Sequence, residues 1–233
     1  MMRALVLSLC LTSLACDDTP LSVPGAAPTP TAEAEPAGPG LPVDHPPVEL
    51  APTSAAPKRL SVDMLQASLP IVAGDDAEGR PIGWTITRNN RAIDALSNEG
   101  LGGALGRPDY VQVTAEPALP TPLYGKLMDD MARDVCVKII AADLARPDAS
   151  RRTLARFASL DAADGANTPA AIGANLRYLK LRFLGQKVDD DDDRAIADLR
   201  TLYAVASSDG ADPRAGWTAV CVGLLVSPTF HLY

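Results

Sequence analysis

Histidine is nearly absent from this 233-residue chain, which contains only His45 and His231. A Ser-His-Asp or Cys-His pair needs a histidine beside the nucleophile, and His45 lies in a proline-rich stretch. No histidines and cysteines have zinc-binding spacing, and the haem-attachment pattern C-x-x-C-H is absent. The sequence therefore offers no catalytic constellation and predicts no cofactor.

Aromatic residues and positive charge are also scarce. Aromatic residues make up 4% of the chain, so Leu, Ala, Val and Ile must fill the core, which favours packing of helix on helix. The net charge of −8 leaves no basic stripe to neutralise phosphates. We therefore expect no nucleic-acid partner.

The hydrophobic pattern predicts a mainly α domain over residues 58–233, a bundle of about five to seven helices. Its N-terminal part is rich in glycine, and short strands are candidates there. The expected helices are 62–69, 91–96, 122–144, 149–158, 169–184, 195–207 and 213–226, and the candidate strands are 84–87 and 110–114. Gly100, Gly102, Gly103 and Gly106 are expected to interrupt regular structure.

The stretch 122–144 is the longest run that fits a single helix. Its first half is amphipathic, whereas apolar residues surround the second half, from Val135 through Val137 to Ile140. A helix that is apolar on all sides needs partners on all sides. We therefore expect a central buried helix.

Residues 1–15 have the three-part pattern of a secretory signal: a basic residue, a short apolar run and small residues. The run ends in Ser13-Leu14-Ala15-Cys16 and resembles the cleavage site of bacterial lipoproteins, although Ser13 stands where that family favours leucine. The resemblance implies that Cys16 carries fatty acyl chains such as palmitate. It also implies a membrane-anchored protein of the cell envelope that faces the periplasm or the exterior. An ordinary signal peptide with a chance cysteine is the alternative.

Residues 16–57 contain eleven of the 21 prolines, diluted with Ala, Thr, Gly and Glu. Such a segment buries too little apolar surface to offset its ordering entropy, and proline extends it. We predict a disordered tether between a lipid anchor and the domain. A ligand for a proline-recognition module is disfavoured, because no basic residue flanks the prolines before Lys58.

Asp129, Asp130 and Asp134 form a D-D-x-x-x-D pattern on the expected helix 122–144. Paired carboxylates on one helix can hold Mg²⁺, and this pattern loosely resembles prenyl-transfer motifs. Each aspartate can instead form an ion pair along the helix, Asp129 with Arg133 and Asp134 with Lys138. Structural pairing is the favoured interpretation.

Five consecutive aspartates occupy positions 189–193, of which Asp189, Asp191 and Asp193 are candidate cation ligands. An EF-hand loop is excluded, because the sixth residue from Asp189 is Arg194 rather than glycine, and the twelfth is Arg200 rather than glutamate. Carboxylates before a helix also stabilise its N-terminus. We expect this run to be a solvated helix start.

Four cysteines are encoded. If Cys10 leaves with the signal peptide and Cys16 is acylated, Cys136 and Cys221 remain. Thiols outside the cytoplasm are usually oxidised, so the pair could form a disulfide. Two separate buried thiols are the alternative, and the sequence does not decide between them.

The two ends of the domain provide a second resemblance, through Arg59-Leu60-Ser61 near its start and the stretch 224–230 near its end. They resemble domains of secreted planctomycete and myxobacterial proteins that are often joined to c-type cytochrome modules. The resemblance implies an accessory role in an envelope complex. It implies no cofactor of the chain's own, because the haem cysteines are missing.

These features predict a membrane-anchored envelope lipoprotein that acts as a binding, accessory or structural component with an envelope protein partner. The alternative is a metal-dependent envelope enzyme that uses the aspartate-rich helix ends. The two hypotheses differ in whether the aspartates of 129–134 and 189–193 meet in one cleft.

Overall fold

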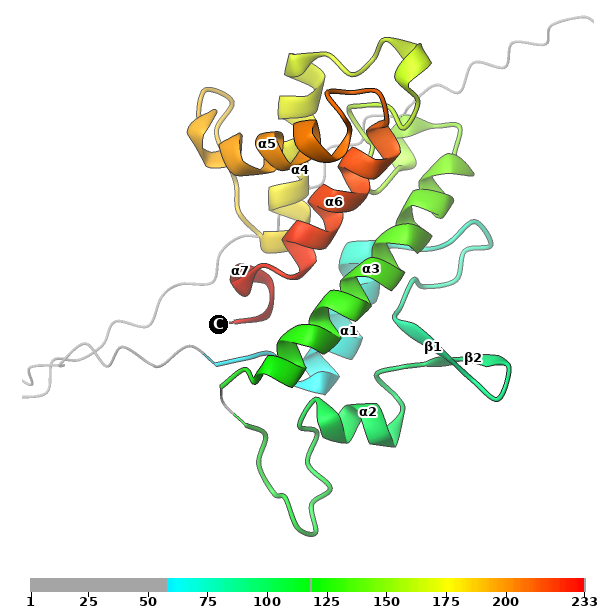
Figure 1. Ribbon diagram of the computed structural model, residues 1–233, viewed down its shortest axis with the longest axis vertical. Coiled ribbons are helices and arrows are strands. Elements are labelled where there is room, and N and C mark those ends of the chain that lie inside the picture. The colour runs from blue at the N-terminus through cyan, green and yellow to red at the C-terminus, as the bar shows by residue number, and fades with distance from the viewer. Residues whose placement is uncertain (1–57, 118, 233) are drawn as a thin grey trace, which may run out of the picture. The chain divides into compact units, whose positions relative to one another are not determined.

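A computed structural model describes residues 58–117 and 119–232 of the chain (Figure 1). The predicted signal peptide, Cys16 and the tether lie outside the described residues. The described part confirms the mainly α fold. Its elements are α1 Val62–Ala73, β1 Thr85–Arg88, β2 Arg91–Asp94, α2 Glu99–Ala104, α3 Pro122–Leu144, α4 Pro169–Leu184, α5 Ala197–Ala206, α6 Pro213–Leu225 and α7 Pro228–His231, with 3-10 turns at Ala149–Arg151, Ala162–Asp164 and Arg194–Ile196.

Helix α3 has the bounds that the sequence predicts. Thr121 caps it by accepting a hydrogen bond from the Tyr124 amide, and Pro122 occupies the first helical position, where no amide proton is needed. Helices α1 and α6 both pack on α3. The expectation of burial on every side is wrong at Val137, which is 62% exposed, because no described helix covers that side.

Helices α4, α5 and α6 form a second group of packed helices (Figure 1). Thr168 caps α4 and Gly185 ends it in a left-handed conformation, so this helix also has its predicted bounds. Trp217 of α6 is fully buried and its ring packs on that of Tyr203 from α5. The core therefore runs continuously from α1 through α3 and α6 to α5.

The segment 91–96, for which the sequence predicts a helix, instead begins with the second strand of a β-hairpin. Asn89 and Asn90 form the two-residue loop of this hairpin with φ values of 51° and 61°. Asparagine tolerates this left-handed conformation, and two such residues produce the turn whose twist matches paired strands. The two strands pair antiparallel, with Thr85 opposite Asp94 and Arg88 opposite Arg91. This pairing overrides the local helical pattern.

Four further expectations are wrong. Helix α1 continues through Pro70 to Ala73, because Leu69 and Ala73 are buried and Gly74 ends the helix. Helix α2, which Asn98 caps, includes three of the glycines that were expected to interrupt regular structure.

No strand forms at 110–114, where the Asp109 carboxylate accepts hydrogen bonds from the backbone amides of residues 111, 112 and 113. Only one 3-10 turn forms within 149–158, because the amides of 153–155 bond to a side chain instead.

The two ends of the described region meet. Arg59 forms an isolated antiparallel bridge with Leu232, and the Leu60 amide donates to the His231 carbonyl at 2.8 Å. Among residues 58–117 and 119–232, no helix has the length and apolar content needed to cross a membrane.

Candidate functional site

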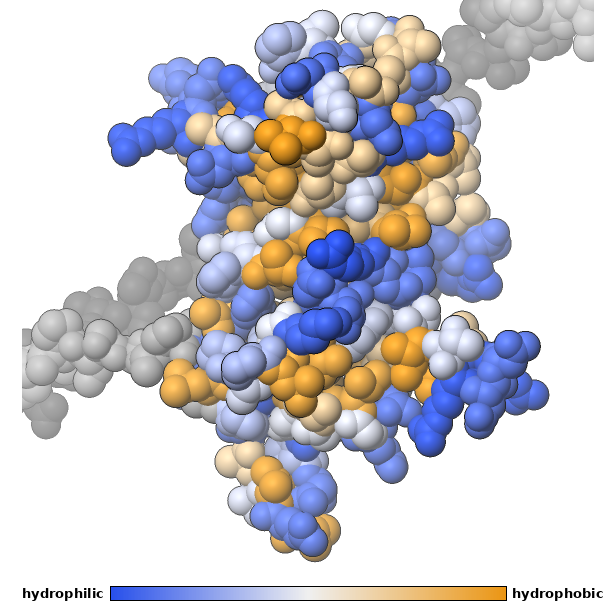
Figure 2. Space-filling view, in the orientation of Figure 1, coloured by the Kyte–Doolittle hydropathy of each residue, from blue (hydrophilic) through white to orange (hydrophobic). Residues whose placement is uncertain are grey.

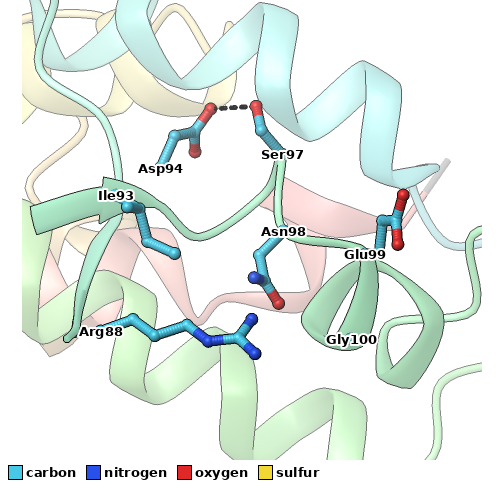
Figure 3. Close-up of a pocket in the computed structure, with 7 residues that line it drawn as sticks. All are labelled: Arg88, Ile93, Asp94, Ser97, Asn98, Glu99 and Gly100. Carbon is cyan, nitrogen blue, oxygen red and sulfur yellow. Dashed lines mark hydrogen bonds between the residues drawn. The ribbon is translucent and has the colours of Figure 1, made fainter.

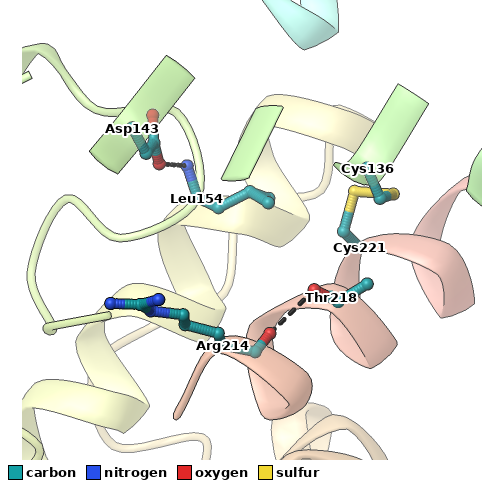
Figure 4. Close-up of a disulfide and its surroundings, with 6 residues drawn as sticks. All are labelled: Cys136, Asp143, Leu154, Arg214, Thr218 and Cys221. Carbon is teal, nitrogen blue, oxygen red and sulfur yellow. Dashed lines mark hydrogen bonds between the residues drawn. A yellow bond between two sulfur atoms is a disulfide. The ribbon is translucent and has the colours of Figure 1, made fainter. Parts of the chain in front are cut away.

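Cys136 of α3 and Cys221 of α6 are joined in the structure, with Sγ atoms 1.99 Å apart and Cα atoms 5.9 Å apart (Figure 4). Both residues are fully buried. The bond links α3 to α6 across 85 residues of sequence. Its burial and position are those of a structural crosslink.

The Asp143 carboxylate, drawn with this crosslink in Figure 4, is fully buried at the end of α3. It accepts hydrogen bonds from the amides of Thr153, Leu154 and Ala155 at 2.7, 2.7 and 3.1 Å. Arg146 lies 3.6 Å from the same carboxylate. Asp143 therefore holds the irregular segment after α3 in place. No local sequence pattern signals this role, because the amides it binds lie ten to twelve residues away.

The three aspartates of the D-D-x-x-x-D pattern each have a cationic partner on α3. The hydrogen bond from Arg133 lowers the pKa of Asp129, at an Nε–Oδ2 distance of 2.9 Å. Asp130 pairs with Lys126. Asp134 lies 2.6 Å from Lys138 and accepts the Thr85 amide of β1 at 2.9 Å. These contacts are ion pairs along one helix and a hydrogen bond to β1, which is the structural role that the sequence favours.

The aspartate run 189–193 lies between α4 and α5. Asp193 accepts hydrogen bonds from both Arg177 of α4 and Arg200 of α5, at 2.8 and 3.0 Å. Asp192 accepts the amide of Ala195 at the start of the following turn. Asp189 and Asp191 are exposed. Within the described residues, no three acidic, histidine or cysteine side chains form a group that could hold a metal ion.

Arg59, Tyr124 and His231 form a buried cluster where the two ends of the described region meet. The Arg59 guanidinium lies 4.9 Å from the centre of the Tyr124 ring, and the centres of the Tyr124 and His231 rings are 5.7 Å apart. Burial raises the pKa of Tyr124. Burial also lowers the pKa of His231, and a hydrogen bond to the Leu225 backbone partly opposes this second shift. The Arg59 Nη2, the Tyr124 hydroxyl and the His231 Nδ1 are buried and have no hydrogen-bond partner among the described residues.

An open pocket of about 600 Å³ lies between the hairpin and α2 (Figure 3). Asp94 lines it, but its carboxylate already accepts bonds from Ser97 at 2.6 Å, Gln66 at 3.2 Å and the Leu96 amide at 3.0 Å. Asn98 is engaged as the cap of α2. Asp94, Ser97 and Asn98 are therefore engaged in holding the loop together, and Arg88 and Glu99 are the other polar side chains that line this pocket.

A second cavity, of about 300 Å³, lies between α4, α5 and the loop after α5. Its wall includes the apolar side chains of Pro169 and Ile172 and a mixed set of polar and charged side chains: Asn167, Arg200, Tyr203, Ser207 and Asp209. The Tyr203 hydroxyl and the Arg200 Nε are buried and have no hydrogen-bond partner among the described residues. Burial raises the pKa of Tyr203, so the hydroxyl keeps its proton.

A broader groove of about 690 Å³ lies between α3, α5 and α6. Val137, Leu202, Val222 and Val226 line it, and the Asp129–Arg133 ion pair stands at its edge. Figure 2 shows apolar patches over α3 and α6 on this face, with charged side chains beside them. An apolar floor with a charged rim is typical of a protein-binding surface.

Comparison of the chain with family models, curated proteins and solved structures finds no match. The site residues therefore rest on geometry alone. In the sequence, Arg200 serves only to exclude an EF-hand, and Tyr203 is one residue among many in the predicted helix 195–207. The periodic pattern of that helix indicates burial rather than a site, so sequence reasoning missed both residues.

Proposed function

We propose that the protein is a membrane-anchored envelope lipoprotein whose folded region is a binding component for an envelope protein partner. The anchor is inferred from the run ending in Ala15-Cys16 and from the proline-rich segment that follows. The observation that supports the binding role is the groove between α3, α5 and α6. Its valine side chains include Val137, 62% of which is exposed to solvent.

The rival hypothesis of a metal-dependent enzyme has less support. It required the aspartates of 129–134 and 189–193 to meet in one cleft. In the described part of the chain, the acids of α3 form ion pairs along their own helix, and Asp193 pairs with arginines of α4 and α5.

The anchor is tested by metabolic labelling with an alkyne fatty acid, followed by membrane fractionation. The native chain should incorporate label and sediment with membranes, whereas Cys16→Ser should lose the label and either accumulate unprocessed or be released. Cys10→Ser is the matched control and should behave like the native chain. A Cys16→Ser protein that stays membrane-bound and is cut at the same site contradicts the anchor.

The binding role is tested with a photocrosslinking amino acid placed at Val137 in the native envelope. A partner seated in the groove should give a discrete crosslinked protein. The control is the same amino acid at Ile71 of α1, which is 76% exposed and lies outside the groove. Equal crosslinking from both positions, or none from Val137, would argue against the groove as the docking surface.

A further inference from the structure

The loop between α2 and α3 projects from the body of the domain (Figure 1). Figure 2 shows apolar side chains on this projection, with polar ones beside them. Its tip, residues 109–115, includes Tyr110, Val111 and Val113, whose side chains are 72%, 85% and 50% exposed. Single exposed apolar residues are ordinary on protein surfaces, but three within four positions of one projection form a patch that indicates a contact.

Hydrogen bonds build the tip into a defined turn. The Asp109 carboxylate accepts the amides of residues 111, 112 and 113 at 2.9, 2.8 and 2.8 Å, and the Tyr110 amide donates to the Val113 carbonyl at 3.0 Å. Tyr110 has a φ of 57°, a left-handed conformation that is costly for a bulky side chain. The turn therefore holds its apolar side chains in solvent at a cost in backbone strain.

The tip carries no charge between Asp109 and Glu116, where the sequence of residues 110–115 is Tyr-Val-Gln-Val-Thr-Ala. The Asp109 carboxylate is engaged with backbone amides, and Glu116 is half-buried toward the base of the loop. Uncharged side chains with a tyrosine among them suit the boundary between lipid headgroups and acyl chains. There the ring is buried while the hydroxyl stays hydrated.

The convex shape of the tip also favours lipid over a folded partner. None of the cavities described above is lined by a residue of the tip, so it offers no hollow in which a partner's side chain could be seated. A fluid bilayer needs no such hollow, because lipids close around a projecting group.

The base of the loop is fastened to the residue that follows the junction with the predicted tether. Arg59 is 5% exposed, and its Nε donates to the Pro117 carbonyl at 2.6 Å while its Nη1 donates to the Leu105 carbonyl. One of these carbonyls precedes the tip and the other follows it. The predicted tether, residues 16–57, reaches the described region at Lys58. The loop therefore begins and ends beside the point where the anchored segment joins the domain.

We propose that residues 109–115 insert into the headgroup region of the bilayer to which the protein is anchored. This contact rests on the proposed lipid anchor and is separate from the docking groove. Fully extended, residues 16–57 span roughly 140–150 Å, so the anchor alone does not hold the domain on the surface. Two valines and a tyrosine bind lipid weakly by themselves, but an anchored chain meets the bilayer at a high effective concentration.

The contact is tested on vesicles of phosphatidylcholine and a nickel-chelating lipid. The predicted mature chain, residues 16–233 with Cys16→Ser, is held on them by an N-terminal histidine tag. Val111→Trp places a fluorescent reporter in the tip. Bromine atoms on the acyl chains quench a tryptophan that enters the bilayer, so vesicles with and without brominated lipid are compared.

The matched control is Val205→Trp, because Val205 is 75% exposed on α5, at the opposite end of the domain from the loop (Figure 1). The native Trp84 and Trp217 are 4% and 0% exposed, so they supply a constant background. Anchored Val111→Trp should lose emission in brominated vesicles, and its emission should shift to shorter wavelength. Val205→Trp should show neither change.

A second substitution separates the loop's own affinity from that of the added tryptophan. Val113→Asp in the Val111→Trp chain should restore most of the lost emission, because a charge opposes insertion. Val205→Asp in the same chain should restore none. All of these positions are exposed, and circular dichroism before vesicles are added shows whether each variant is folded.

The inference is overturned if Val111→Trp is quenched no more than Val205→Trp, or if Val113→Asp leaves the quenching unchanged. A discrete protein crosslink from a photocrosslinking amino acid at Val111 in the native envelope, without quenching on vesicles, would assign the loop to a protein partner and also overturn it. Because the tag supplies the attachment, quenching does not depend on acylation of Cys16. Quenching without the fatty-acid label would reject the native anchor and support the loop contact, whereas the label without quenching would reject the loop contact alone.

Discussion

Gly216 of α6 lies directly against the ring of Tyr203 on α5. A Cβ atom on Gly216 would stand 2.7 Å from two ring carbons and 2.8 Å from the Ser207 Cβ. This is closer than carbon atoms pack, so the absence of a side chain at 216 allows α5 and α6 to approach. The same contact sets the position of Tyr203 in the cavity wall.

The contact predicts that Gly216→Ala lowers the free energy of unfolding by about 1–3 kcal/mol, because the ring must move out of a packed core. Gly125→Ala is the control. Gly125 is exposed on α3, and an alanine Cβ there would have no atom within 4 Å, so alanine should stabilise the protein by up to about 1 kcal/mol. Urea unfolding monitored by circular dichroism measures both. Equal effects of the two substitutions would show that helix propensity, not packing, governs position 216.

The link between Cys136 and Cys221 closes a loop of 85 residues. In the chain-entropy model such a crosslink stabilises the folded state by about 4–5 kcal/mol, so the Cys136→Ala/Cys221→Ala double variant should unfold at much lower urea concentration. The native protein, denatured without reductant, should show neither thiol to a thiol-specific reagent. Two reactive thiols per chain would mean that the mature protein carries the cysteines reduced.

Substitution of Asp143 should also change the stability of the folded protein. Its carboxylate accepts bonds from three backbone amides while fully buried, and an asparagine at this position would turn an amide donor toward at least one of them. We expect Asp143→Asn to lower the free energy of unfolding by about 2–4 kcal/mol. Asp129→Asn breaks a solvent-accessible pair and should change it little. Hydrogen exchange should show lost protection at residues 153–155 only in the first variant.

The lowered pKa of His231 predicts a dependence of stability on pH. Burial favours the neutral ring in the folded protein, whereas the unfolded chain takes up a proton near pH 6.5. Below that pH the unfolded state binds more protons than the folded state, so stability falls from about pH 6.5 down to the folded pKa and then levels off.

His231→Gln removes this titrating group, and the difference in unfolding free energy between the native chain and the variant should therefore change as the pH falls through about 6.5, where the histidine of the unfolded chain takes up its proton. Thermal unfolding at a series of pH values measures the difference. A difference that is constant with pH would mean that His231 titrates alike in both states. His45, the only other histidine, is present in both proteins and cancels in the comparison.

Local sequence determined the long helices of this protein. Thr121-Pro122 and Thr168-Pro169 each supply a capping hydroxyl followed by a residue suited to the first helical position, so α3 and α4 begin where the sequence predicts. Where such signals were weaker, contacts made at a distance decided the outcome. Residues 91–94 became a strand because Asn89 and Asn90 form the hairpin turn, and Asp143 held residues 153–155 out of a helix.

The candidate binding sites depend on tertiary structure alone. Tyr203 and Arg200 fit an ordinary amphipathic pattern on α5, and their importance emerges only where α4 and the loop after α5 enclose the cavity with them. Likewise, Val137 belongs to the half of α3 in which apolar residues surround the helix, and only the packing of α6 on α3 decides which side stays exposed. Periodicity reports how apolar a helix is, whereas the placement of its neighbours determines which of its side chains remain available for binding.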